Sequence, residues 1–193
     1  NLFKLNFDSP SIAVSGVEFF NILLNVNNSN PIYNTYVSID SVHTNFYDIS
    51  DFNLLNLTHN DTLFVRSEFK GGKNLKDKYE LNLYHTINEE KLSVVGFKKS
   101  EVFFKDFQWS INENNDKANK LVFNKKLMDF TIDSLAISHN KQMVNLSGVM
   151  RDSTYKKLNL SFGNVDLNKI TPDIENLSFG GKIDGEVNFS QMK

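Results

Sequence analysis

The residues of this chain that can take part in acid–base, nucleophilic or metal chemistry are few and scattered. The sequence has no cysteine, which excludes a disulfide framework, a thiolate metal site and a cysteine nucleophile. Its four histidines are His43, His59, His85 and His139, and no two of them have the spacing of metal ligands. We expect His43, His59 and His139, which lie beside Asn, Thr or Ser, to be solvated. His85 fits a satisfied position within a strand.

Pairs of carboxylates are the minimum requirement of a glycosidase, and the closest pairs here are Glu89–Glu90, Asp48 with Asp51, and Asp184 with Glu186. Turn residues or a polar strand face surround each pair, so we interpret them as solvated. The chain also lacks a nucleophile elbow, a phosphate loop and a dinucleotide fingerprint. We therefore predict a non-enzymatic protein with no catalytic residue, no cofactor and no metal site.

Composition limits the class of protein further. The chain has 193 residues, of which 40% are hydrophobic, enough to form a core. Its 21 Lys and Arg face 23 Asp and Glu, so no basic excess exists for binding nucleic acid. No stretch approaches the roughly 18 apolar residues of a membrane span. Because the first residue is Asn1, we expect a fragment of a larger protein or a processed product.

Alternation of apolar and polar residues with a period of two is the dominant pattern of the sequence. In 79–87 it places Tyr79, Leu81, Leu83 and Ile87 on one face of a strand. Further candidate strands, each bounded by turn-forming or charged residues, are 2–7, 20–26, 33–39, 52–57, 63–69, 107–111, 130–132, 144–149, 158–162 and 182–189. Helical spacing is limited to one short turn at 167–174. The sequence therefore predicts an all-β fold of mostly short strands.

Asparagine is unusually abundant, with 27 residues against 9 Gly and 3 Pro. Asn and Asp tolerate left-handed backbone, so we expect them to form most of the turns. Residues 159–163 recur as 176–180, and the hairpin from 63 to 84 resembles the one from 144 through Asp152–Ser153 to 162. This repetition favours a stack of similar hairpins.

The aromatic and basic residues allow two interpretations each. Trp109 and the 17 Phe could stack on sugars, but most of them occupy the apolar register of a strand, which favours packing in a core. The pairs Lys98–Lys99, Lys125–Lys126 and Lys156–Lys157 lie at strand ends, where lysines protect sheet edges or stay in solvated turns. Contact with lipid headgroups is the alternative for these lysines.

The order of strands from about residue 60 resembles the TamB (translocation and assembly module) family of the AsmA-like superfamily, in its Bacteroidetes form. The stretches that carry this resemblance are 64–72, 83–87, 95–100, 107–112, 120–123, 130–135, 144–148, 158–167 and the closing unit 181–187. Residues 1–59 share only their β character. We expect 1–193 to be one continuous β-rich segment of a larger protein.

The resemblance implies a curved, taco-like sheet whose apolar concave face shields lipid acyl chains between the inner and outer membranes. It implies a periplasmic location, an inner-membrane anchor elsewhere in the full-length chain, an outer-membrane β-barrel partner, and a role in outer-membrane protein assembly. The groove candidates are the residues in inward-facing registers, namely Leu81, Leu83, Trp109, Ile111, Ile132, Leu146, Leu158, Leu160 and Phe162.

Three alternatives remain open at this stage. One is an unrecognised hydrolase, which would need two carboxylates that converge in a cleft. Within the same family, unpaired sheet edges would chaperone outer-membrane β-strands. Outside it, a compact surface β-sandwich for adhesion or glycan binding would show the same alternation, because a sealed core and an open apolar groove need the same residue pattern.

Overall fold

The structure is a computed structural model that describes residues 2–30, 32–45, 47–152, 154–171 and 177–192. Almost all of its regular elements are strands, as the alternation predicts. The strands are β1 (Lys4–Val14), β2 (Val17–Asn27), β3 (Thr35–His43), β4 (Ile49–His59), β5 (Thr62–Gly71), β6 (Asp77–Ile87), β7 (Ser93–Phe97), β8 (Ser100–Phe104), β9 (Phe107–Ile111), β10 (Lys120–Phe123), β11 (Asp129–His139), β12 (Gln142–Arg151), β13 (Tyr155–Asp166) and β14 (Lys182–Met192). A 3-10 turn, η1 (Lys73–Leu75), and a short helix, α1 (Leu167–Ile170), complete the described elements.

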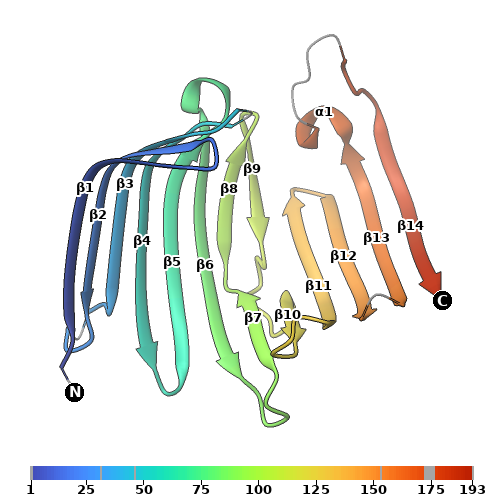
Figure 1. The fold of residues 1–193 in the computed structure, drawn as a ribbon. Coiled ribbons are helices and arrows are strands. Elements are labelled where there is room, and N and C mark those ends of the chain that lie inside the picture. The colour runs from blue at the N-terminus through green and yellow to red at the C-terminus, as the bar shows by residue number, and fades with distance from the viewer. Residues whose placement is uncertain (1, 31, 46, 153, 172–176, 193) are drawn as a thin grey trace. The chain divides into compact units, whose positions relative to one another are not determined.

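These fourteen strands form one antiparallel sheet in which sequence order sets spatial order (Figure 1). β7 and β8 both pair with β6, so together they occupy one position in the sheet, as a strand interrupted between Phe97 and Ser100. In the same way β9 and β10 both pair with β11 and occupy the next position. The fourteen strands thus occupy twelve successive positions in an up-and-down sheet. The predicted all-β fold is confirmed, and the structure shows that its strands are antiparallel.

The chain forms two compact units, which are residues 1–83 (unit 1) and 84–193 (unit 2). The division falls inside β6, not near residue 60, where the sequence resemblance begins. Unit 1 contains β1 to β5, η1 and the first part of β6. Unit 2 contains the remainder of β6, β7 to β14 and α1.

Asparagine and aspartate perform the backbone role expected of them. Of the eighteen described non-glycine residues with positive φ, eight are Asn and four are Asp. Asn60 and Asp61, with φ of 47° and 57°, form the two-residue turn between the paired residues His59 and Thr62. The abundance of Asn therefore supplies left-handed positions that glycine supplies in other chains.

Two asparagine side chains hold the interruption between β9 and β10. Asn112 is 4% exposed and donates from Nδ2 to the carbonyl of Phe97 at 2.7 Å. Asn119 is 3% exposed and accepts at Oδ1 from the backbone N–H of Ala136 at 2.8 Å. These amides replace ladder hydrogen bonds that the loop 112–119 removes, and the buried polar groups of the neighbouring strands stay paired.

Loss of the Asn119 amide should therefore destabilise unit 2. In Asn119→Ala the N–H of Ala136 loses its buried acceptor, and we expect a loss of about 1–3 kcal/mol in the free energy of unfolding. Urea denaturation followed by circular dichroism measures it. Asn114→Ala, an exposed position in the same loop, is the control, and equal losses in the two variants would contradict this role.

The local predictions hold unevenly. Most candidate strands lie within observed strands, and the observed strands are longer. The candidate 52–57, for example, lies within β4. The predicted helical turn at 167–174 is observed as α1, although residues 172–174 lie outside the described residues. Residues 178–180, in the second copy of the 159–163 repeat, are not in a strand, and Asn176 lies outside the described residues, as Ser153 does.

Candidate functional site

Cross-strand pairing in unit 2 collects apolar side chains on one face of β9 to β14. Residues directly opposite each other in neighbouring strands project from the same face, and so do residues two apart along a strand. Three successive rows are Leu121–Ile132–Gly148–Leu158–Phe189, Leu135–Leu146–Leu160–Val187 and Ile111–Ile137–Val144–Phe162. A fourth row, Phe123–Phe130–Met150, ends at Lys156. We call the apolar residues of these four rows the apolar face of unit 2.

This register requires a glycine at one position. Gly148 has φ of +146°, and a Cβ there would lie 2.2 Å from the Lys157 carbonyl oxygen and 3.1 Å from a Leu158 methyl group. Leu158 therefore packs across β12 where a side chain would otherwise stand. The glycine keeps the first row continuous.

The opposite face of the same strands is polar. Asn145, Ser161 and Glu186 follow one another across β12 to β14. In the neighbouring row Asn159 donates from Nδ2 to Asn188 Oδ1 at 2.9 Å. The sheet of unit 2 is thus amphipathic, with a hydrogen-bonding face and an apolar face.

No second layer covers the apolar face within the described part of unit 2. Its side chains are mostly half-buried, and Val187 and Phe189 near the β14 edge are 55% and 53% exposed. The only helix described in the unit is the four-residue α1. The described residues of unit 2 thus leave these apolar side chains partly accessible to solvent.

One end of the apolar face is closed by a cluster that we call the Trp109 cap, formed by Trp109, Phe107, His139 and Lys169. Trp109 is 1% exposed, and its ring centroid lies 5.3 Å from that of His139. Lys169 of α1 places Nζ 4.2 Å from the centroid of the Phe107 ring, a cation–π contact. Val165, on the apolar face of β13 beyond Phe162, is fully buried at this end.

Hydrogen bonds fix the cap. His139 Nδ1 lies 2.7 Å from the Gln108 carbonyl oxygen and therefore carries the proton, which leaves Nε2 to face Lys169 Nζ at 3.5 Å. The Asp166 side chain accepts from the N–H of Asn168 and caps α1. Trp109 Nε1 is buried and has no hydrogen-bond partner among the described residues.

Opening of the cap should be visible in the fluorescence of Trp109, the single tryptophan of the chain. In Lys169→Ala the cation–π contact with Phe107 and the contact with His139 are lost, so we expect a red-shifted emission and stronger quenching by acrylamide. Lys141→Ala, at an exposed turn position, is the control. An emission spectrum unchanged in Lys169→Ala would show that α1 does not hold the cap.

Unit 1 carries the other two groove candidates, Leu81 and Leu83. The Tyr79 ring stacks on Phe69 at 4.5 Å between centroids, so Leu81 and Leu83, two and four residues further along β6, share that face. Leu24, Val37 and Leu54 form an apolar row across β2 to β4 that continues to Ser67 of β5. The Ser67 hydroxyl is buried there without a hydrogen-bond partner among the described residues.

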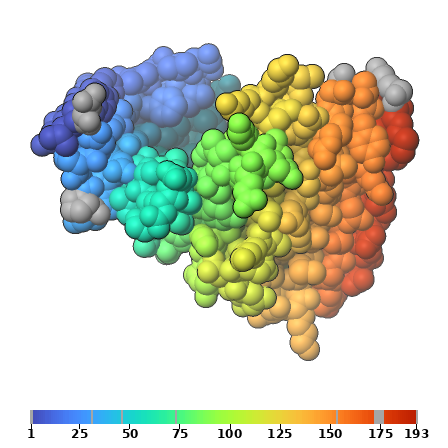
Figure 2. Space-filling model, turned by 90° about the horizontal axis from the view of Figure 1, so that it is seen from below, coloured from blue at the N-terminus to red at the C-terminus, as the bar shows by residue number. Residues whose placement is uncertain are grey.

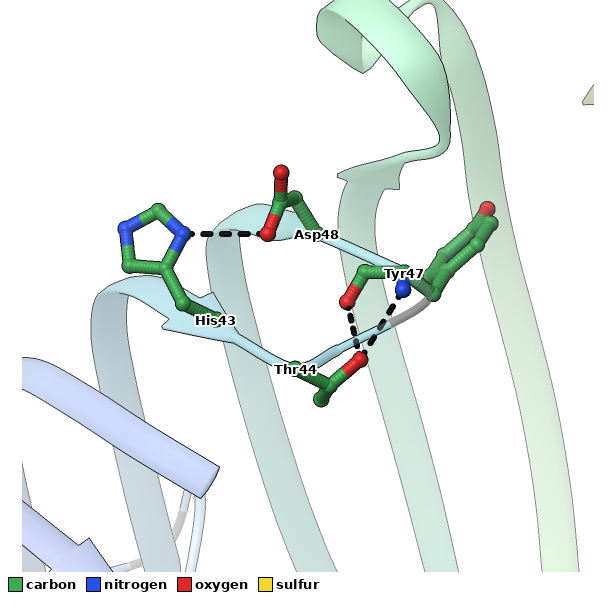
Figure 3. Close-up of polar contacts among 4 residues, drawn as sticks. All are labelled: His43, Thr44, Tyr47 and Asp48. Carbon is green, nitrogen blue, oxygen red and sulfur yellow. Dashed lines mark hydrogen bonds and ion pairs between the residues drawn. The ribbon is translucent and has the colours of Figure 1, made fainter. Parts of the chain in front are cut away.

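A polar cluster closes one end of unit 1 around the loop between β3 and β4 (Figure 3). Thr44 Oγ1 accepts from the Tyr47 N–H at 2.9 Å, and His43 Nδ1 lies 3.0 Å from Asp48 Oδ1. The hydroxyls of Tyr47 and Tyr79 are 2.7 Å apart. The Tyr47 ring occupies the space above Gly71, where a Cβ would approach it within 2.5 Å.

The raised pKa values of the two tyrosines in this cluster indicate a structural role. Burial, followed by the hydrogen bond with Tyr79, raises the pKa of Tyr47, and burial also raises the pKa of Tyr79. Both phenols therefore stay neutral at physiological pH and act as hydrogen-bond partners instead of bases. The cluster fixes the β3–β4 loop on the end of the sheet.

Alkaline pH should test this role. Because the pKa of Tyr47 in the folded chain lies above the unfolded value of about 10, its contribution to stability is complete below that pH and decreases as pH rises. We expect urea denaturation to show a smaller loss of stability between pH 8.5 and 10.5 in Tyr47→Phe than in the unmodified chain. Tyr155→Phe is the control, and an identical pH dependence in both variants would contradict the assignment.

Neither a metal-binding cluster nor a membrane-spanning helix is found among the described residues. No group of three or more His, Cys, Asp or Glu side chains within the described ranges is placed to hold a metal ion. Neither helical segment described here is long and apolar enough to cross a membrane. Comparison of the chain with protein-family models, curated proteins and solved structures gives no match.

The structure thus separates the groove candidates into three groups. Ile111, Ile132, Leu146, Leu158, Leu160 and Phe162 share the apolar face of unit 2, Leu81 and Leu83 belong to unit 1, and Trp109 is buried in the cap. His139, expected to be a solvated turn residue, packs its ring against Trp109 instead. Sequence reasoning missed α1 and Lys169 as parts of the cap, since no local pattern reports which distant strand a side chain will meet.

Proposed function

We propose that this chain is a non-enzymatic segment of a TamB-like envelope protein that shields lipid acyl chains on the apolar face of its sheet. The observation that supports this proposal is the continuous apolar face of unit 2, aligned by register across β9 to β14 and left without a covering layer in the described residues. The proposal takes the apolar face as the concave lining of a curved, taco-like sheet.

The energetics favour an acyl chain as the occupant. Each methylene exposed to water costs about 0.8 kcal/mol, so an acyl chain of about 16 carbons loses on the order of 10 kcal/mol when it crosses water unprotected. Leu, Ile, Val and Phe side chains offset that cost without directional bonds, which lets a lipid move along the face. The Asn- and Ser-rich opposite face stays hydrated.

Location and partners follow from the same proposal. The segment would lie in the periplasm, with an inner-membrane anchor elsewhere in the full-length protein and an outer-membrane β-barrel as partner. Support of outer-membrane protein assembly is part of it, because β1 and β14 each pair with a single strand in the described sheet and such edges accept an added strand.

A charge on the apolar face should displace lipid. In Phe189→Asp, at a position 53% exposed, we expect lipid occupancy to fall about tenfold, because burial of a Phe side chain contributes about 1.5–3 kcal/mol. Native mass spectrometry after incubation with phosphatidylglycerol vesicles measures the occupancy. Ser190→Asp is the matched control, since residue 190 faces the polar side opposite Lys157.

The central variant Leu160→Asp distinguishes the open face from a sealed core. Loss of lipid with retained β-sheet circular dichroism supports the proposal. An unmodified chain that binds no lipid, together with unfolding of Leu160→Asp, contradicts it and favours the adhesion or glycan-binding sandwich.

A further inference from the structure

We propose that the end of the apolar face opposite the Trp109 cap binds the headgroup of an anionic acyl lipid, so that the lipid lies with its tail towards the cap. This inference rests on the proposed function and adds the orientation and the charge of the ligand. The headgroup site is a set of basic residues that we call the basic rim, namely Lys125, Lys126 and Lys156.

The first argument is the order of side chains along β13. Lys156, Leu158, Leu160 and Phe162 occupy alternate positions and therefore project from one face, with the lysine at the outer end. Lys156 is directly opposite Met150, so its side chain starts on the apolar face itself. Six residues of strand at about 3.3 Å each span about 20 Å. One leaflet contributes about half of the 30 Å hydrocarbon core, so a single acyl tail fits this length.

The second argument is that the two ends of the apolar face differ. Beyond Phe162 the face ends at the fully buried Val165 and at Trp109, and the Lys169 ammonium group of that end lies over the Phe107 ring, 4.2 Å from its centroid. Beyond Leu158 it ends at an ammonium group. An amphiphile with an acyl tail and an anionic head matches this polarity in one direction only.

The third argument is the local charge. The turn between β10 and β11 lies against the β12–β13 turn, because the Asp152 N–H donates to the Met128 carbonyl oxygen at 2.8 Å. Figure 2 looks onto the molecule from this end, where the yellow-to-orange atoms of these segments reach the surface. Residues 124–129 and 150–157 carry five basic and two acidic side chains, a net charge of +3 in a chain whose net charge is −2.

The two carboxylates of this region are already engaged. Asp129 Oδ2 accepts from Asn124 Nδ2 at 2.6 Å, and Asp152 Oδ1 accepts from the Thr154 N–H at 2.6 Å. Arg151 donates to the Phe130 carbonyl oxygen. Lys125, Lys126 and Lys156, by contrast, form no ion pair with a carboxylate of the described residues.

The neighbouring turn limits the site. The β6–β7 turn carries Glu89, Glu90 and Lys91, a net charge of −1, so the excess of positive charge lies in the turns between β10 and β13. The headgroup of a net anionic lipid is attracted by several ammonium groups. A zwitterionic headgroup also carries a cation, which the same ammonium groups repel. The rim therefore selects for net charge, and the apolar face selects for the tail.

The test compares lipids with identical tails by isothermal titration. Dioctanoyl phosphatidylglycerol should bind about fivefold more tightly than dioctanoyl phosphatidylcholine, the ratio given by one lysine contact near an anionic group. The variant Lys125→Gln, Lys126→Gln, Lys156→Gln should bind the two lipids equally. The variant Lys117→Gln, Lys141→Gln, Lys182→Gln removes the same charge from exposed positions elsewhere and should keep the preference.

Each result decides between the two proposals. Equal binding of both lipids by the unmodified chain overturns the headgroup site and leaves the acyl-binding function standing. Binding of neither lipid overturns both. Inorganic phosphate at millimolar concentration should not displace phosphatidylglycerol, and displacement by phosphate would identify a free-anion site that does not depend on the apolar face.

Discussion

Backbone hydrogen bonding within a single antiparallel sheet is the constraint on which the rest of this structure depends. Except at β7 to β10, each strand pairs with its sequence neighbours, so successive side chains must project from opposite faces and align with those across the ladder. A single layer cannot bury both faces. In unit 2 the consequence is a hydrogen-bonded Asn and Ser face and an apolar face whose side chains are mostly partly exposed, with Trp109 and Val165 among the fully buried residues.

Departures from regular strand geometry give this sheet its individual features. A bulge in β11 between Ile132 and Leu135, and another in β13 between Phe162 and Val165, insert one residue and keep the flanking apolar side chains on the same face. At the interruption between β9 and β10, Asn112 and Asn119 substitute side-chain amides for backbone partners. The Trp109 cap and the basic rim then make the two ends of the apolar face chemically different.

The sequence predicts much of this fold because short-range rules set it. Alternation from Leu158 to Phe162 is enough to place these side chains on one face, and the Asn60–Asp61 turn follows from the tolerance of both residues for left-handed backbone. The second copy of the 159–163 repeat shows the limit of such rules. It has nearly the same residues, yet residues 178–180 lie outside any strand, because pairing with a neighbour and not composition makes a strand.

By itself the sequence determined the all-β class, the positions of most strands and turns, and the apolar register of each strand. Only the tertiary structure decided which registers meet across the sheet, that Trp109 is enclosed by His139 and α1, and that the lysine-bearing turns before β11 and β13 adjoin. The physical reason is the range of the interactions. Side-chain alternation and turn conformation depend on residues a few positions apart, whereas register, bulges and the contact of Lys169 with Phe107 depend on residues brought together from distant strands.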